Sequence, residues 1–456
     1  MTVAESGLVA VLDYIRANHE RFVSELSDLC AMESVSAWGR SLEQTAEAVG
    51  QSLERAGAKV SIVKTSGQPI VVGKAEGGSD RTIVFYDHYD VQPPDPLEQW
   101  TAPPFEPAVR DGCLFARGTA DNKGNLMARV QAVEAWNRAG GGLPISVVFI
   151  VEGEEETGSP HLEEFTRENA AWLGRADGVI WEAGYRDVTG RPTVSLGVKG
   201  ICYLELTARG ASSDLHSSMA TLVPNPAWRL TWALATIKDK DERILVEGFY
   251  DAVRDPTRED LALLETIPDN SAETASRLGL EGLLLRLTGH QANLRNFFQP
   301  TATICGLLSG YTGKGEKTVL PSTAMAKVDF RLVADQDPAD IESKVRAHLA
   351  RQGFDDIEVR AFAGERPART DPKSPLVGVI RRAMSRVYEQ EPVVYPTMTG
   401  SGPMPLFTDL GLPVAGFGVG HAGSRVHAPD ENISLEDYRL GTELVAALLD
   451  GDSWAG

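Results

Sequence analysis

An apolar segment that ends in a cluster of carboxylates constrains the fold more than any other part of this sequence. Ile145–Val151 is almost continuously apolar, and four glutamates follow within five positions: Glu152, Glu154, Glu155 and Glu156. Such a run is typical of a strand in a parallel sheet that is covered on both faces. Carboxylates crowded at a strand end repel one another, so they need nearby cations or some must be protonated. The alternative is an exposed acidic loop.

Helical and strand patterns alternate around this segment. Apolar residues at helical spacing cover Leu8–Ala31, Leu42–Ala56, Lys123–Ala139, Pro375–Tyr388 and Leu435–Leu449, and strand patterns cover Lys59–Val63, Ile70–Lys74, Thr82–Tyr86, Gly178–Trp181 and Pro413–Gly416. This alternation predicts an α/β fold with a doubly wound, mostly parallel sheet.

The pattern changes near residue 190, where a second domain is expected. Thr193–Val198 and Ile201–Ala208 are predicted to pair as strands around Lys199–Gly200. The further elements expected here are a helix at Asn225–Lys238, strands at Ala302–Leu308, Ala324–Leu332 and Ile357–Ala363, and a helix at Pro338–Arg351. We therefore predict a main α/β domain of residues 1–190 and 367–456, with an α+β, ferredoxin-like domain inserted at 191–366.

Charge and cysteine usage narrow the class of protein. The chain has 456 residues and a net charge of −20, so its surface repels nucleic acid and anionic membranes, and we expect neither as a partner. No apolar run reaches the length of about 20 residues that spans a bilayer. The four cysteines, Cys30, Cys113, Cys202 and Cys305, form no C-x-x-C pair, which favours free thiols in a reducing compartment and a cytoplasmic location.

Candidate metal ligands lie next to several predicted strands. His88 and Asp90 follow the strand Thr82–Tyr86, and residues two apart in extended chain point the same way. Glu182 directly follows another strand, so parallel pairing would bring it to the same edge of the sheet. Asp121 precedes the helix Lys123–Ala139 and could bridge two cations, although it fits equally well as a helix N-cap. Taken alone, the His88–Asp90 triplet fits a surface turn.

These segments, together with a histidine near the C-terminus, form a complete donor set for two metal ions. Imidazole nitrogen and carboxylate oxygen together suit borderline divalent ions, of which we expect zinc, with manganese or cobalt as alternatives. Two histidines, His421 and His427, compete for the C-terminal position, and spacing does not choose between them.

Several ordered motifs resemble the M20 family of metallopeptidases, and within it the carnosinase-like dipeptidases. The resemblance runs from about Leu8 to the C-terminal helix. It rests on the motifs His88–Pro93, Arg117–Gly118 with Asp121–Gly124, Glu152–Ser159, Asp214–Ser217 and Phe330–Val333. The resemblance implies that one ion is held by His88, Asp121 and Glu182, and the other by Asp121, Glu156 and His427.

The resemblance also implies roles for residues that bind no metal. Glu155 would be the general base, and Asp90 would orient the imidazole of His88. His216 would belong to a lid and dimerisation domain and reach the active site of the partner subunit of a homodimer. Arg331 would receive the carboxylate of a small peptide substrate.

Departures from the family pattern keep other substrates open. Glu182 stands where carnosinase-like enzymes often have Asp, Asp87 replaces a usual glycine, and Gly400–Met404 differs from the usual Gly-Gly-Ser-Ile-Pro stretch. An aminoacylase or N-deacylase acting on N-acyl amino acids is therefore the main alternative. A non-catalytic metal-binding protein is disfavoured because no ligand or base is missing, and a serine hydrolase because no G-x-S-x-G motif is present.

Overall fold

A computed structural model describes residues 3–455, which form two compact units. Unit 1 comprises the residues up to Gly197, Arg369–Pro396 and the residues from Leu406 onward, and unit 2 comprises Val198–Ala368 and Thr397–Pro405. The short segment Thr397–Pro405 lies in unit 2, although the sequence assigned it to the first domain. Among the residues described, no helix has both the length and the apolar character needed to cross a membrane.

Unit 1 is built on a mixed, mostly parallel eight-stranded sheet in the order β1-β2-β6-β3-β7-β19-β9-β18. Parallel pairing joins β6 to β3, β3 to β7 and β7 to β19 at its centre, and β1, β2 and β6 pair antiparallel at one side. The strands are β1 Lys59–Val63, β2 Ile70–Ala75, β3 Thr82–His88, β6 Ser146–Glu152, β7 Gly178–Trp181, β9 Thr193–Ser195, β18 Val393–Tyr395 and β19 Val414–Gly416. This agrees with the predicted α/β class.

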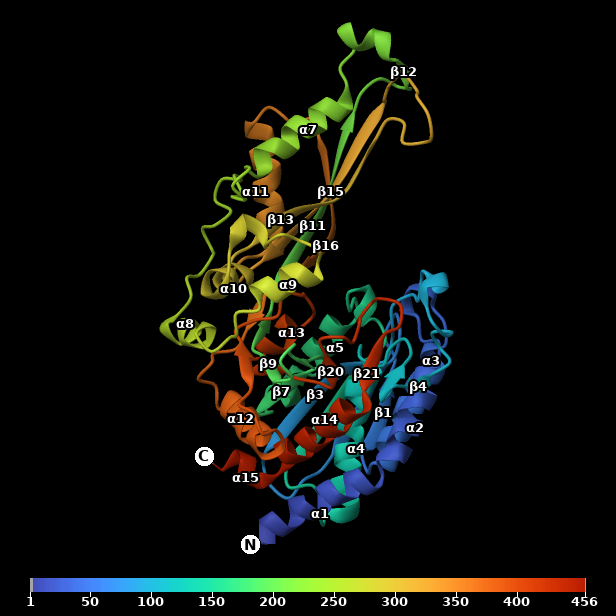
Figure 1. The fold of residues 1–456 in the computed structure, drawn as a ribbon, viewed down its shortest axis with the longest axis vertical. Coiled ribbons are helices and arrows are strands. Elements are labelled where there is room, and N and C mark those ends of the chain that lie inside the picture. The colour runs from blue at the N-terminus through green and yellow to red at the C-terminus, as the bar shows by residue number, and fades with distance from the viewer. Residues whose placement is uncertain (1–2, 456) are drawn as a thin grey trace. The chain divides into compact units, whose positions relative to one another are not determined.

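Helices from both ends of the chain pack around this sheet. They are α1 Val3–Ala17, α2 His19–Cys30, α3 Leu42–Arg55, α4 Lys123–Ala139, α5 Leu162–Glu168, α6 Ala170–Leu173, α12 Pro375–Val387, α14 Leu435–Leu449 and α15 Gly451–Trp454. Figure 1 shows α1, α4 and α14 side by side, although α1 and α14 come from opposite ends of the chain. The continuous helical pattern at Leu8–Ala31 is divided into two helices at Asn18, whose amide donates to the carbonyl of Tyr14.

Unit 2 contains a four-stranded antiparallel sheet in the order β13-β15-β11-β16. Its elements are β11 Gly200–Arg209, α7 Pro226–Ile237, β13 Thr301–Ser309, β15 Thr323–Leu332, α11 Pro338–Arg351 and β16 Glu358–Glu365. Along the chain they follow a β-α-β-β-α-β order. Between α7 and β13 lie the shorter helices α8 Arg258–Leu264, α9 Ser271–Arg277 and α10 Gly289–Phe298.

The core of unit 2 lies between its sheet and its two long helices. Alternate residues of β11 are buried, as period-two alternation requires for a sheet with one covered face. Leu204 and Leu206 belong to the same buried cluster as Leu230 of α7 and Val345 of α11. The opposite face and the edge strand β13 are much more exposed.

The predicted pairing of Thr193–Val198 with Ile201–Ala208 is wrong. β9 pairs with β18 and β19 in unit 1, whereas β11 pairs with β15 and β16 in unit 2. Lys199–Gly200 therefore lies where the chain passes from one unit to the other and does not form a hairpin turn. Adjacent strand patterns suggested local pairing, but partners that are distant in the sequence formed the sheets.

Candidate metal centre

The carboxyl ends of the central strands bring the predicted ligands to one edge of the sheet of unit 1. His88 is the last residue of β3 and lies in parallel register with Glu152, the last residue of β6. β7 pairs with the other side of β3 and ends at Trp181, so Glu182 leaves the sheet at the same edge. Open α/β sheets bind their ligands beyond this edge of the sheet.

Asp121 lies between the two predicted histidine ligands. Its Oδ1 is 3.1 Å from Nε2 of His88, and its Oδ2 is 3.1 Å from Nε2 of His427. His88 Nε2 also lies 3.4 Å from Glu182 Oε2, and His427 Nε2 lies 3.2 Å from Glu156 Oε2. One carboxylate therefore faces both histidines, although they are 339 positions apart in the chain. The N-cap of α4 is Asn122, so the alternative role of Asp121 as an N-cap is not observed.

The donor atoms of this cluster fit divalent metal ions. Two groups of possible ligand atoms each lie within 4.8 Å of one another, namely His88, Glu155 and Glu156, and Asp121, Glu156 and His427. Glu156 Oε1 and Glu182 Oε2 are buried and have no hydrogen-bond partner among the described residues. Buried carboxylate oxygens without partners are costly, and a cation would satisfy them. The residues present therefore fit the divalent ions that the donor chemistry predicts.

The four glutamates at the end of β6 and directly after it divide into two pairs. Glu152 accepts hydrogen bonds from Tyr86 and from Ser159, and Glu154 lies 2.6 Å from Nδ1 of His161. Glu155 and Glu156 instead begin the short 3-10 helix η3 Glu155–Thr157 and belong to the possible ligand groups. Only half of the predicted carboxylate cluster therefore faces the candidate metal centre.

Asp90 connects the His88 strand with the Glu155–Glu156 turn. His88 Nδ1 lies 3.0 Å from the carbonyl oxygen of Asp90 and 3.3 Å from its Oδ1, which leaves Nε2 facing Asp121 and Glu182. The Asp90 carboxylate also accepts hydrogen bonds from the backbone amides of Glu155 and Glu156. Contacts of this kind fix the tautomer and orientation of a metal-binding imidazole.

Burial and crowding shift the proton affinities in this cluster. Burial, reinforced by Glu182, raises the pKa of Glu155 well above its usual value. Burial likewise raises the pKa of Glu182. Burial alone would lower the pKa of His88, but the surrounding carboxylates outweigh it and raise the pKa well above normal. Hydrogen bonds to Asp121 and Glu156 raise the pKa of His427 to about 10. Without metal, the cluster therefore retains protons that bound cations would displace.

His427, and not the competing His421, lies in this cluster. His421 Nε2 is 3.0 Å from Oδ1 of Asn432, and its Nδ1 accepts a hydrogen bond from the amide of Gly423, so both ring nitrogens are used within its own loop. His427 has φ = 59°, a left-handed conformation that is uncommon for a residue other than glycine.

Sequence reasoning missed several residues that hold the ligands in place. Glu431 is fully buried, pairs with Arg117, and accepts hydrogen bonds from the backbone amides of Gly118, Ala120 and Asp121. Gln92 donates a hydrogen bond to Glu156 Oε2 at 2.8 Å. Gln92 lies inside the His88–Pro93 motif, which could have suggested a role, whereas Glu431 carried no comparable signal.

His216 and Arg331 belong to unit 2. His216 is exposed, with Nδ1 near the Ser218 hydroxyl at 2.8 Å and Nε2 near the Thr318 hydroxyl at 3.2 Å. Arg331 donates hydrogen bonds to Asp329 and to the hydroxyl of Ser401. Their predicted roles toward the site in unit 1 stay predictions.

Comparison with known proteins identifies the family. Residues 84–451 match the peptidase family M20/M25/M40. The M20 family metallo-carboxypeptidase Sso-CP2 from Sulfolobus solfataricus is 37% identical, with a TM-score of 0.90 over 94% of this chain and 98% of that chain. Human Beta-Ala-His dipeptidase is 28% identical over 96% of this chain and 92% of its own length. The Cys-Gly metallodipeptidase dug1 of Schizosaccharomyces pombe is 28% identical over 74% of this chain and 75% of its own length.

These similarities agree with the sheet architecture of unit 1 and with the donor chemistry at its edge. They cover nearly the whole chain, so they do not depend on the metal-binding motifs alone. The chain belongs to the peptidase family M20/M25/M40.

Proposed function

We propose that this protein is a metal-dependent dipeptidase that hydrolyses the amide bond of dipeptides. The observation that carries the proposal is the position of Asp121, whose two carboxylate oxygens face His88 and His427 separately. A carboxylate placed in this way can be shared between two ions. Similarity to dipeptidases along most of the chain supports dipeptides as the substrate class.

The residues of the cluster would divide the work of hydrolysis. His88, Asp121 and Glu182 would hold one ion, and Asp121, Glu156 and His427 the other. Two bound divalent ions supply a lowered pKa for water and polarisation of a carbonyl group. Glu155 would accept a proton from the attacking water and pass it to the departing amine. A carboxylate oxygen of Glu155 lies within 4.8 Å of possible ligand atoms of His88 and Glu156, and this position supports its role as the base.

We propose zinc as the native metal because the cluster combines imidazole nitrogen with carboxylate oxygen. Manganese and cobalt suit the same donor set. A cytoplasmic location remains our prediction, supported by the four cysteines, which are free thiols in the structure.

Two residues of unit 2 would complete substrate recognition. Arg331 would hold the terminal carboxylate of the substrate, since a guanidinium group can bind a carboxylate through two parallel hydrogen bonds. Its bonds to Asp329 and Ser401 fix the orientation of the guanidinium group. His216 would stabilise the negative charge that develops on the carbonyl oxygen in the partner subunit's site.

A carboxypeptidase acting on longer peptides is the second candidate function. It is favoured by the 37% identity to an M20 family metallo-carboxypeptidase and by Glu182, which replaces the aspartate frequent in carnosinase-like enzymes. The aminoacylase alternative shares the same site. The three activities differ in what precedes the scissile amide, namely a single residue with a free amine, a longer peptide or an acyl group.

A substrate panel tests these functions. Metal-loaded protein is incubated with dipeptides, with tetrapeptides, and with N-acetyl derivatives of the same C-terminal residues, and released amino acids are quantified. We expect the highest kcat/KM for dipeptides. A preference for tetrapeptides would establish the carboxypeptidase, and a preference for acetylated amino acids the deacylase. Glu155→Gln is the control, with turnover lower by on the order of 10²–10⁴-fold because the base is lost, while both ions remain bound.

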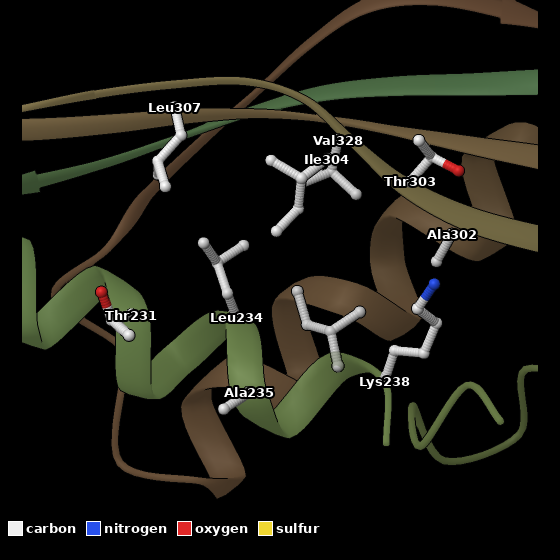
Figure 2. A pocket seen from close by; sticks show the side chains of 10 residues that line it. Thr231, Leu234, Ala235, Lys238, Ala302, Thr303, Ile304, Leu307 and Val328 are labelled. Carbon is white, nitrogen blue, oxygen red and sulfur yellow. The ribbon is translucent and has the colours of Figure 1, made fainter. Parts of the chain in front are cut away.

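We further propose that two copies associate through unit 2. β13 is an edge strand, and its Ile304, Leu307 and Leu308 are all more than half exposed. A cavity of about 450 Å³ lies between β13 and α7, and Figure 2 shows Leu234 of the helix and Ile304 and Leu307 of the strand pointing into it. An exposed apolar edge of this kind favours pairing with another strand, and a second copy offers the same edge.

Two experiments test the dimer. Leu307→Asp should convert a dimer to a monomer by light scattering, whereas Leu222→Asp, at another exposed leucine of unit 2, should not. His216→Ala and Glu155→Gln proteins, each nearly inactive, are then mixed. Recovered activity would mean that one subunit completes the site of the other. A monomeric wild-type protein, or a mixture without recovery, would contradict the proposal.

A further inference from the structure

Arg129 connects the ends of three central strands beneath the candidate metal centre. It lies on α4 and is almost completely buried. Its Nη1 donates to the carbonyl oxygen of Tyr86 in β3 at 2.8 Å. Its Nη2 donates to the carbonyl oxygens of Trp181 and Glu182 at 2.6 and 3.1 Å, and to that of Phe417, just after β19, at 3.4 Å. A single guanidinium group therefore fixes the spacing of β3, β7 and β19 at their carboxyl ends.

Asp87 balances the charge of Arg129 and extends the connection to a fourth segment. Its side chain is fully buried, and Oδ1 accepts hydrogen bonds from Arg129 Nη1 at 2.8 Å and from Asn122 Nδ2 at 3.0 Å. Asp87 Oδ2 has no hydrogen-bond partner among the described residues. Buried ion pairs contribute little net stability, and an unpartnered oxygen reduces that contribution further. Stability alone is therefore a weak explanation for this pair.

The Asp87–Arg129 pair is connected to each ligand on one side of the metal centre. The connection runs either through the ligand's own backbone or through the residue next to it in the chain. Asp87 immediately precedes His88, and Asn122 immediately follows Asp121. The carbonyl oxygen of Glu182 itself accepts from Arg129. These ligands are the three that the resemblance assigns to one ion.

The ligands on the other side are held by different residues. The Glu156 carboxylate accepts a hydrogen bond from Gln92, its backbone amide donates to the Asp90 carboxylate, and His427 lies on a separate loop. No contact of Asp87 or Arg129 with Glu156 or His427 is present in the described structure. The two sides share Asp121 but differ in what fixes their remaining ligands.

We propose that Asp87 and Arg129 are positioning residues that set the affinity of the ion held by His88, Asp121 and Glu182, with little influence on the other ion. The inference rests on the proposed two-metal function and deepens it. Removing a group that orients a metal ligand typically lowers metal affinity by about 10–100-fold. Here most of that loss falls on one ion of the pair, because all three of its ligands are connected to these residues, whereas the other ion shares only Asp121 with them.

The test is calorimetric titration of the full-length, metal-free protein with zinc or manganese. Asp87→Asn keeps the shape of the side chain and removes its charge. It is combined with each of two further substitutions. His427→Ala leaves only the ion held by His88, Asp121 and Glu182. His88→Ala leaves only the ion held by Asp121, Glu156 and His427. We expect the remaining affinity to fall by about 10–100-fold in the first background and to be unchanged in the second.

Arg129→Lys serves as the second variant if Asp87→Asn does not fold. A lysine keeps the charge beside Asp87, but one ammonium group cannot reach the carbonyl oxygens of all three strands, so the same selective loss is expected. Asp450→Asn is the control, because it removes the partner of Arg386 in another part of unit 1 and should change neither affinity. Equal losses in both backgrounds, or no loss in either, would overturn the inference. If affinity for one ion is lost selectively but the wild-type protein hydrolyses no peptide, the proposed function is rejected and the inference about metal affinity is retained.

Discussion

The two sides of the candidate metal centre are built in different ways. On one side, His88 ends a central strand and its side chain is completely buried. On the other side, His427 lies on a loop, and its side chain is 52% exposed. The backbone of this loop has positive φ angles at Arg425, His427 and Asp430, a conformation that costs free energy at residues other than glycine.

This difference shows how one sheet edge can provide two ions with different environments. Ligands on strand ends are held by the sheet before any metal binds, so binding costs them little conformational entropy. A half-exposed ligand on a loop is held by fewer packing contacts, so binding restricts its side chain more. We therefore expect successive binding, with the tighter ion on the His88 side and the weaker ion on the His427 side.

The largest effect should follow from removing the group that the two sides share. Asp121→Asn replaces a carboxylate that faces both histidines with an amide, which is a poor bridging ligand. We expect both affinities to fall and turnover to decrease by more than the roughly 10²–10⁴-fold that a single general base contributes. Metal content after dialysis and the rate of dipeptide hydrolysis are the measurements. Two tightly bound ions in this variant would show that Asp121 is not shared.

A smaller and directional effect should distinguish the two histidines. His427→Ala should remove the weaker phase of a metal titration, and His88→Ala the tighter one. In each case the affinity for that ion should fall by at least about 10–100-fold, the decrease that removal of an orienting residue produces. His421→Ala is the matched control, because that histidine bonds to Asn432 within the His427 loop and should leave both phases unchanged. Loss of the tighter phase in His427→Ala would reverse the comparison.

Much of the His88 side could be predicted from the sequence because buried strands leave a strong pattern. Gly178–Trp181 was predicted as a strand from its apolar run, and β7 has the same bounds. Parallel strands end at one edge of the sheet, so the residues that follow them converge without any knowledge of distant contacts. The helix Lys123–Ala139 was also predicted with the bounds of α4, which places Asp121 at its start.

The His427 side and the supporting residues could not be predicted in the same way. Spacing did not choose between His421 and His427, because the conformation of an irregular loop depends on contacts such as those of Asp430 with Thr101. Arg129 acts mainly through backbone carbonyl groups, which every residue carries, so its role leaves no pattern in the sequence. The predicted strand pairing at residues 193–208 was wrong because the true partner strands are distant in the chain.

The smallest expected effect is a pH dependence to which His427 contributes together with groups of the His88 side. In the metal-free protein, hydrogen bonds to Asp121 and Glu156 raise the pKa of His427 from 6.5 to about 10. A group whose pKa is higher in the folded state binds protons preferentially there, so its contribution to stability is complete below 6.5 and is lost as pH rises toward 10. The pKa values of His88, Glu155 and Glu182 are also raised, so these groups act in the same direction. The lowered pKa of Asp121 acts only at strongly acidic pH.

The melting temperature of the metal-free protein should therefore fall across this pH range, and the increase produced by added zinc should grow, because metal and protons compete for the same ligands. His427→Ala should weaken both trends, whereas His421→Ala should leave them unchanged. Calorimetric melting at several pH values, with and without metal, is the measurement. If His427→Ala retains the full pH dependence, the protons displaced by metal come from the His88 side. The loop would then contribute a neutral ligand, and the contrast between the two sides would be one of exposure and not of charge.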